Sequence, residues 1–109
     1  MQEIKFDAAR VLANLYELRK IGAYKTGVHR PTLSPEDMES RRWLAAKLEA
    51  IGHTAKIDGI ANVFGRCPAP GPKLLSGSHI ESQNHAGWLD GALGVVYALE
   101  AATALATTP

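Results

Sequence analysis

The segment 91–106, GALGVVYALEAATALA, constrains the fold of this chain more than any other part of the sequence. It is apolar on almost every side and carries one charge, Glu100. Its composition predicts a helix, and a helix without a polar face is normally buried on all sides. A chain of 109 residues forms one domain at most, so it has few other elements with which to surround this helix.

Two amphipathic helices are predicted in the first half of the chain. Asp7 can cap a helix that runs to about residue 20, with buried positions at Ala8, Val11, Leu12, Leu15 and Leu18. Ser34 begins a second helix that ends at Gly52, because a hydroxyl cap, a proline and two acidic residues follow one another at its start. The stretch 22–33 has two glycines, a proline and no periodicity, so we expect a loop there.

Three short strands are expected before the last helix, at 54–58, 60–66 and 73–78. The order helix, helix, strand, strand, strand, helix indicates the opening of an α/β domain with a mixed sheet and flanking helices. These elements offer too little surface to cover the helix 91–106. We therefore expect its packing partners to lie in sequence outside these residues, with partner subunits as the less favoured alternative.

Charge and cysteine content exclude several classes of protein. The net charge is +1, with both signs scattered, so no basic stripe is available to bind nucleic acid. No apolar run approaches the roughly 18 residues of a membrane span, and the start lacks the apolar stretch of a signal peptide. The single cysteine, Cys67, excludes an internal disulfide and a cysteine-based zinc site. A reduced, cytoplasmic location is expected.

The segment 77–95, GSHIESQNHAGWLDGALGV, carries the candidate chemistry. His79 and Glu81 directly follow a predicted strand, and residues two apart in an extended chain point to the same side. Asp90 precedes a glycine at the start of the apolar helix, where the positive end of the helix favours a carboxylate. These three side chains can therefore meet at one place.

An imidazole nitrogen and a carboxylate are good ligands for zinc, manganese or cobalt. A carboxylate can also bridge two ions about 3.5–4 Å apart, and such a pair activates water for attack. An acidic residue beside the histidine, here Glu81, suits the task of fixing the orientation of the ring. Taken alone, this spacing is more often structural, and an aspartate at the position of Asp90 is more often a helix cap.

The sequence resembles a known family in this same segment. GSHIESQ and DGALGV are similar to the two halves of the first metal-binding motif of the M20 metallopeptidase group, in its hydantoinase/carbamoylase branch. That motif reads roughly G-S-H-[LI]-D-[ST]-[VQ], a glycine-containing loop, then D-G-x-[LY]-G-V. Residues 18–52 resemble the N-terminal helices and loop of the family, and IDGIANVFGR resembles its strand pair, D-x-x-G-N-x-x-G-R. The resemblance covers essentially the whole chain.

The resemblance implies that residues 1–109 are the N-terminal portion of a dinuclear metallopeptidase-like catalytic domain, without the dimerisation domain. It implies two divalent ions, with His79 bound to one and Asp90 bridging both. Glu81 takes the place of a catalytic-site aspartate that orients the histidine. Gln83 is assigned to substrate binding. The implied activity is hydrolysis of linear amide or carbamoyl C–N bonds in small N-carbamoyl or ureido substrates, by homodimeric enzymes.

The general-base glutamate and the remaining metal ligands of the family fall after the last residue of this chain. We therefore expect weak or partial metal binding and no activity from these residues alone. Three alternatives stay open: an M20 aminopeptidase or deacylase fragment, a small non-catalytic module that binds a partner through 91–106, and a lone metal-binding module. Gln83 and the GVHRP loop favour the carbamoylase branch. In that loop a solvated role for His29 and Arg30 is favoured over substrate contact, and His85 is expected to be an exposed loop histidine.

Overall fold

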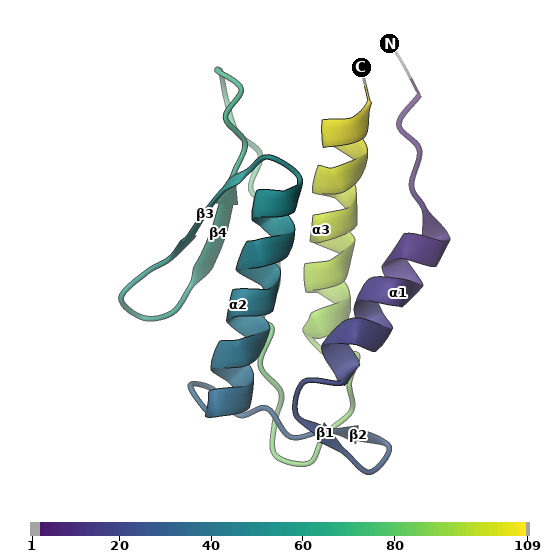
Figure 1. Cartoon of the computed structure of the whole chain (residues 1–109), viewed down its shortest axis with the longest axis vertical. Helices are drawn as coiled ribbons and strands as arrows, with labels where there is room; N and C mark the ends of the chain where they lie inside the picture. The colour runs from purple at the N-terminus through teal and green to yellow at the C-terminus, as the bar shows by residue number, and fades with distance from the viewer. Residues whose placement is uncertain (1–2, 109) are drawn as a thin grey trace.

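The computed structural model describes residues 3–108, and Figure 1 shows their arrangement. Within that range the helices and strands occur together, which agrees with the expected α/β composition. In the view of Figure 1, α3 stands between α1 and α2, and the β3–β4 hairpin lies beyond α2. The elements follow in the order α1 (Ala8–Arg19), β1 (Ala23–Tyr24), β2 (Gly27–Val28), α2 (Pro35–Ala50), β3 (Thr54–Ile57), β4 (Val63–Arg66) and α3 (Ala92–Thr107).

The first two helices begin where the sequence predicts. The Asp7 carboxylate accepts a hydrogen bond from the main-chain N–H of Arg10, and the Ser34 hydroxyl accepts one from that of Asp37. Pro35 occupies the first turn of α2, where its missing N–H costs nothing. Each such cap stabilises its helix by about 1 kcal/mol.

The hydrophobic core lies where α1, α3 and the segment around Ile80 meet. Ile80 is buried there with residues of both helices, and Trp43 and Leu44 of α2 pack against the same cluster. Each fully buried side chain of this kind contributes about 1.5–3 kcal/mol. The buried members of the cluster are Leu15, Leu18, Ile80, Ala92, Val95 and Val96.

Within the described residues helix α3 is buried on one side only, as expected from the small surface that the other elements offer to it. It packs against α1, while Tyr97 and Leu105 are more than half exposed. Its single charge, Glu100, is 3% exposed and is held by Arg10. None of the helices within 3–108 combines the length and the hydropathy needed to cross a membrane.

Two expectations about strands are wrong. The stretch 22–33 is not merely a loop, because it contains the antiparallel pair β1–β2, and Val28 also pairs with Ala86. Strands of two residues are too short for any periodicity to reveal. The expected strand 73–78 does not form: no described strand lies beside it, and Leu74 and Leu75 are 101% and 90% exposed.

The predicted β3–β4 hairpin forms, with Thr54 opposite Arg66 and Ile57 opposite Val63, but β4 begins at residue 63 and not at 60. Its turn is ordered by Asp58, whose carboxylate accepts hydrogen bonds from the main chain of Ile60 and from the main chain and side chain of Asn62. The hydrogen bond from Asn62 is the main reason that the pKa of Asp58 lies below its usual value.

Candidate functional site

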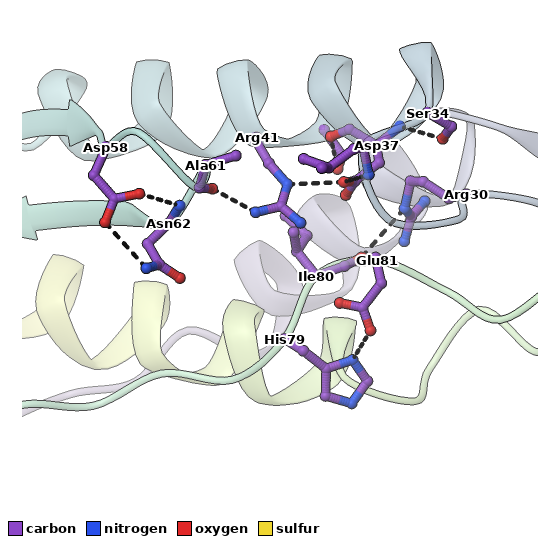
Figure 2. A network of polar contacts seen from close by, with 12 residues as sticks. Arg30, Ser34, Asp37, Arg41, Asp58, Ala61, Asn62, His79, Ile80 and Glu81 are labelled. Carbon is purple, nitrogen blue, oxygen red and sulfur yellow. Dashed lines mark hydrogen bonds and ion pairs between the residues drawn. The ribbon is translucent and has the colours of Figure 1, made fainter.

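The candidate site lies where the segment after β4 crosses the beginning of α3. Ile80 points into the core, so its neighbours His79 and Glu81 point together to the other side. Nδ1 of His79 lies 2.8 Å from Oε1 of Glu81. Figure 2 shows the Glu81 carboxylate pointing toward the His79 ring. A carboxylate at this position favours the tautomer with a proton on Nδ1, which leaves a lone pair on Nε2.

Asp90 faces the other nitrogen of the same ring. Its Oδ2 lies 3.6 Å from Nε2 of His79, too far for a hydrogen bond. The N-cap of α3 is Gly91, with no side-chain cap bond, and the Asp90 side chain is 87% exposed. The helix-cap alternative for Asp90 is therefore wrong, and its carboxylate is available to a ligand.

Two glycines allow this close approach. Gly91 has a φ of +74°, and a Cβ at that position would lie 2.3 Å from Cε1 of His79. A Cβ at Gly94 would lie 2.8 Å from the Cβ of Ser78. Any side chain at either position would push the histidine segment away from the helix.

The loop between Glu81 and Asp90 is held against the β1–β2 hairpin. Val28 and Ala86 exchange two main-chain hydrogen bonds of 2.9 Å each. Farther along the loop, the Trp88 ring stacks on Tyr16 at 5.8 Å between centroids and lies under the guanidinium of Arg19. Elements from the beginning of the chain therefore hold the loop that brings Asp90 to His79.

The other predicted residues lie around this loop. Gln83 is exposed, and the structure shows no role for its side chain, so substrate binding there stays a prediction. His85 is exposed as expected, and its ring stacks on Tyr24 at 4.2 Å. Nδ1 of His29 accepts a hydrogen bond from the main-chain N–H of His85, at 3.2 Å.

Arg30 is neither solvated nor open to a substrate, because it is 1% exposed. Its guanidinium donates to main-chain carbonyls of α1 and of the site segment. The favoured prediction of a solvated role for Arg30 is therefore wrong. The residues of GVHRP do not by themselves indicate contacts with carbonyl groups that are distant in the sequence. Within GVHRP, the apolar residue Val28 is the one that indicates a buried segment, and it is fully buried.

The donor atoms that meet here suit a divalent ion, but they are few. His79 and Asp90 offer one imidazole nitrogen and one carboxylate, while Glu81 holds the ring. Within residues 3–108 no cluster of three or more histidine, cysteine or acidic side chains is formed. The described residues therefore fit part of a metal site, whereas tight sites use three or four protein ligands.

A groove of about 240 Å³ opens beside His79 and Glu81, and Arg41 and Asn62 contribute polar atoms to its wall. The rest of its lining is mainly apolar and comes from Leu44, Val63, Phe64 and Ile80. A second hollow, of about 310 Å³, lies in the loop around Cys67 and is lined by none of the candidate site residues. The groove is thus the space that a small molecule could enter next to the candidate site.

Known proteins with similar sequences act on C–N bonds. The chain is 37% identical over 101 residues to N-carbamoyl-L-amino-acid amidohydrolase of Paenarthrobacter aurescens, which covers 90% of this chain and 24% of that protein. It is 35% identical over 97 residues to allantoate deiminase 2 of Glycine max, covering 86% of this chain and 20% of that protein. No protein-family model matches the chain.

Among solved structures, the chain is similar to amidases. A hydantoinase/carbamoylase family amidase from Burkholderia phymatum has 48% identity and a TM-score of 0.95, covering 99% of this chain and 27% of that one. A second, from Burkholderia ambifaria, has 31% identity and a TM-score of 0.87, covering 95% and 27%. The predicted fold class is therefore confirmed. The chain spans about a quarter of the length of these proteins.

Proposed function

We propose, from the membership of this chain in the hydantoinase/carbamoylase family of amidases, that residues 77–95 supply the first part of a two-metal hydrolase site. The reaction is hydrolysis of a linear amide or carbamoyl C–N bond. One observation carries the proposal: the free carboxylate of Asp90 faces Nε2 of His79, while Glu81 occupies Nδ1 of the same ring.

Each residue has a distinct role in this proposal. His79 offers Nε2 to one divalent ion, and Asp90 offers its two oxygens to both ions. Glu81 is a positioning residue, because it acts by fixing the orientation of the His79 ring. When bound, the ions supply Lewis-acid activation of water and of the substrate carbonyl. Zinc, manganese and cobalt all suit this donor set.

The proposal also limits what these residues do by themselves. With His79 and Asp90 alone, each ion has two protein ligands at most, so binding is weak or partial. Residues 1–109 thus act as the N-terminal portion of a catalytic domain. The other metal ligands, the general base and the dimerisation domain come from further sequence. The isolated chain has no turnover. A homodimer and a cytoplasmic location stay predictions.

The substrates proposed are small N-carbamoyl amino acids or related ureido compounds, and Gln83 is the candidate for contact with them. A chimera tests this: the present chain replaces the corresponding quarter of the Burkholderia phymatum amidase, whose backbone it matches at a TM-score of 0.95. We expect hydrolysis of an N-carbamoyl-L-amino acid with added manganese or zinc. We expect its loss in the chimeras with His79→Ala or Asp90→Asn.

Arg42→Lys is the matched control, since Arg42 is exposed on α2 and lies outside the site. A folded chimera that cleaves dipeptides and no ureido compound would assign the aminopeptidase alternative. A folded chimera without activity on any amide, peptide or ureido substrate would contradict the hydrolase proposal. Stoichiometric, tight zinc binding by the isolated chain would instead support a lone metal-binding module.

A further inference from the structure

Arg30 joins the end of α1 to the site segment from inside the protein. Its Nη1 donates to the main-chain carbonyls of Leu18, at 3.1 Å, and Ile21, at 2.8 Å. Its Nε donates to the carbonyl of Ile80, at 3.3 Å. Figure 2 shows Arg30 beside the segment that carries Ile80, with a dashed line between them. A single side chain thus satisfies carbonyls of two elements that are far apart in sequence.

The carbonyl of Ile80 lies between the two residues that face each other in the site, His79 and Glu81. The orientation of this peptide group sets the direction of the main chain on both sides of it. Ser82 holds the same segment again: its N–H donates to the Arg30 carbonyl, and its hydroxyl accepts from the Arg30 N–H, each at 2.8 Å. The site segment is therefore fixed at successive points by one residue.

The chemistry of these contacts requires a guanidinium. Burial lowers the pKa of Arg30, whereas the nearby charges of Asp37 and Glu81 raise it, and an arginine in a protein keeps its proton. The planar group donates from Nε in one direction and from Nη1 in another. A lysine would keep the charge but has one nitrogen, so it could not reach the carbonyls of α1 and of Ile80 together.

We infer that Arg30 is a positioning residue for the proposed metal site. It holds the Ile80 carbonyl so that Nδ1 of His79 meets the carboxylate of Glu81 and Nε2 faces Asp90. The inference rests on the proposed function for its consequence on metal binding. The orientation of His79 itself is measurable without any metal, so the two can fail separately.

The test compares the unsubstituted chain with Arg30→Lys. In the unsubstituted chain we expect slow hydrogen exchange at the Nε–H of Arg30, observed by NMR, and fast exchange there would overturn the inference without need of a variant. In Arg30→Lys we expect the Nδ1–H signal of His79 to lose its hydrogen-bonded shift at constant pH. We also expect the affinity for Co²⁺, titrated alone, to fall by about 10- to 100-fold.

Arg10→Lys is the control for lost stability, because it weakens the opposite end of α1 without touching the site segment. Circular dichroism and thermal unfolding are used to compare the helix content and the stability of the two variants. If Arg10→Lys at equal stability loses the His79 signal as well, Arg30 acts only through stability and the inference is wrong. If no chain binds Co²⁺ but the His79 signal still depends on Arg30, the proposed metal function fails and the positioning role stands.

Discussion

The Glu100 carboxylate of α3 accepts two hydrogen bonds of 2.7 Å from the guanidinium of Arg10 on α1, across 90 residues of sequence. The main-chain N–H of Asp7 donates a third hydrogen bond to the same carboxylate. Glu100 is the one charge of the apolar helix, and this pair explains how it is buried. It fixes the start of α1 against the middle of α3.

The Arg10–Glu100 pair predicts a loss of stability in acid. The hydrogen bond from Arg10 is the main cause that lowers the pKa of Glu100 below its usual value of 4.5. A lowered pKa in the folded state adds stability above the unfolded-state value, and this part is lost as the pH falls through the folded-state value. We expect the free energy of unfolding, measured with urea, to decline from about pH 5 downward.

The variant Glu100→Gln isolates this contribution from those of other carboxylates. Loss of the charged hydrogen bonds should cost about 1.5–3 kcal/mol at pH 7, and the decline in acid should become shallower than in the unsubstituted chain. An equal decline in both chains would show that Glu100 does not titrate as the structure indicates.

Substitution of Asp7 should lower the stability of the fold, whereas substitution of Asp90 should weaken metal binding. Asp7 caps α1, so Asp7→Ala should lower the free energy of unfolding by about 1 kcal/mol. Asp90 is exposed and caps nothing, so Asp90→Asn should change it by less than about 0.5 kcal/mol. Only Asp90→Asn should weaken Co²⁺ binding. A clear loss of stability in Asp90→Asn would restore the helix-cap alternative.

Gly91→Ala should displace the His79 ring in addition to straining the backbone. The substitution places a methyl group 2.3 Å from the His79 ring and forces a non-glycine residue to a φ of +74°. With a ψ of −57° this backbone lies outside the left-handed helical region, and such strain costs a non-glycine residue about 1–3 kcal/mol. Gly52→Ala is the matched control, because Gly52 has a φ of +87° and nothing within 4 Å of the added carbon.

We therefore expect both glycine variants to lose stability, measured by urea unfolding, and Gly91→Ala to lose more. The NMR signals of the His79 ring should shift in that variant and stay unchanged in Gly52→Ala. Equal stabilities together with an undisturbed His79 ring would contradict the close approach described above.

Two leucines should differ sharply in their contribution to stability. Leu18 is 1% exposed in the core, so Leu18→Ala should cost about 2–5 kcal/mol. Leu75 is 90% exposed in the segment where a strand was expected, so Leu75→Ala should change the free energy of unfolding by less than about 0.5 kcal/mol. A large cost at Leu75 would mean that the segment is paired in solution, for example between two chains.

The sequence predicts features that depend on near neighbours. The caps at Asp7 and Ser34 are local, because each side chain bonds to a main-chain group three residues away. The proximity of His79 and Glu81 is also local, since it follows from their spacing on an extended segment.

Features that depend on distant contacts were missed. Nothing within GVHRP indicates that Arg30 reaches carbonyls of Leu18 and Ile80, 12 and 50 residues away. The pairing of Val28 with Ala86 is equally invisible, because a two-residue strand has no pattern. In the opposite sense, the pattern of 73–78 is that of a strand, but a strand requires a neighbour, and the described chain provides none beside it.

The stacking of Trp88 on Tyr16 has a practical consequence for optical measurements. Trp88 stands two positions before Asp90, whereas the other tryptophan, Trp43 of α2, donates its indole N–H to Glu17. A Trp43→Phe chain would thus emit from a single indole beside the site. Its fluorescence would report movements of the loop that carries Asp90, in a protein with no added dye.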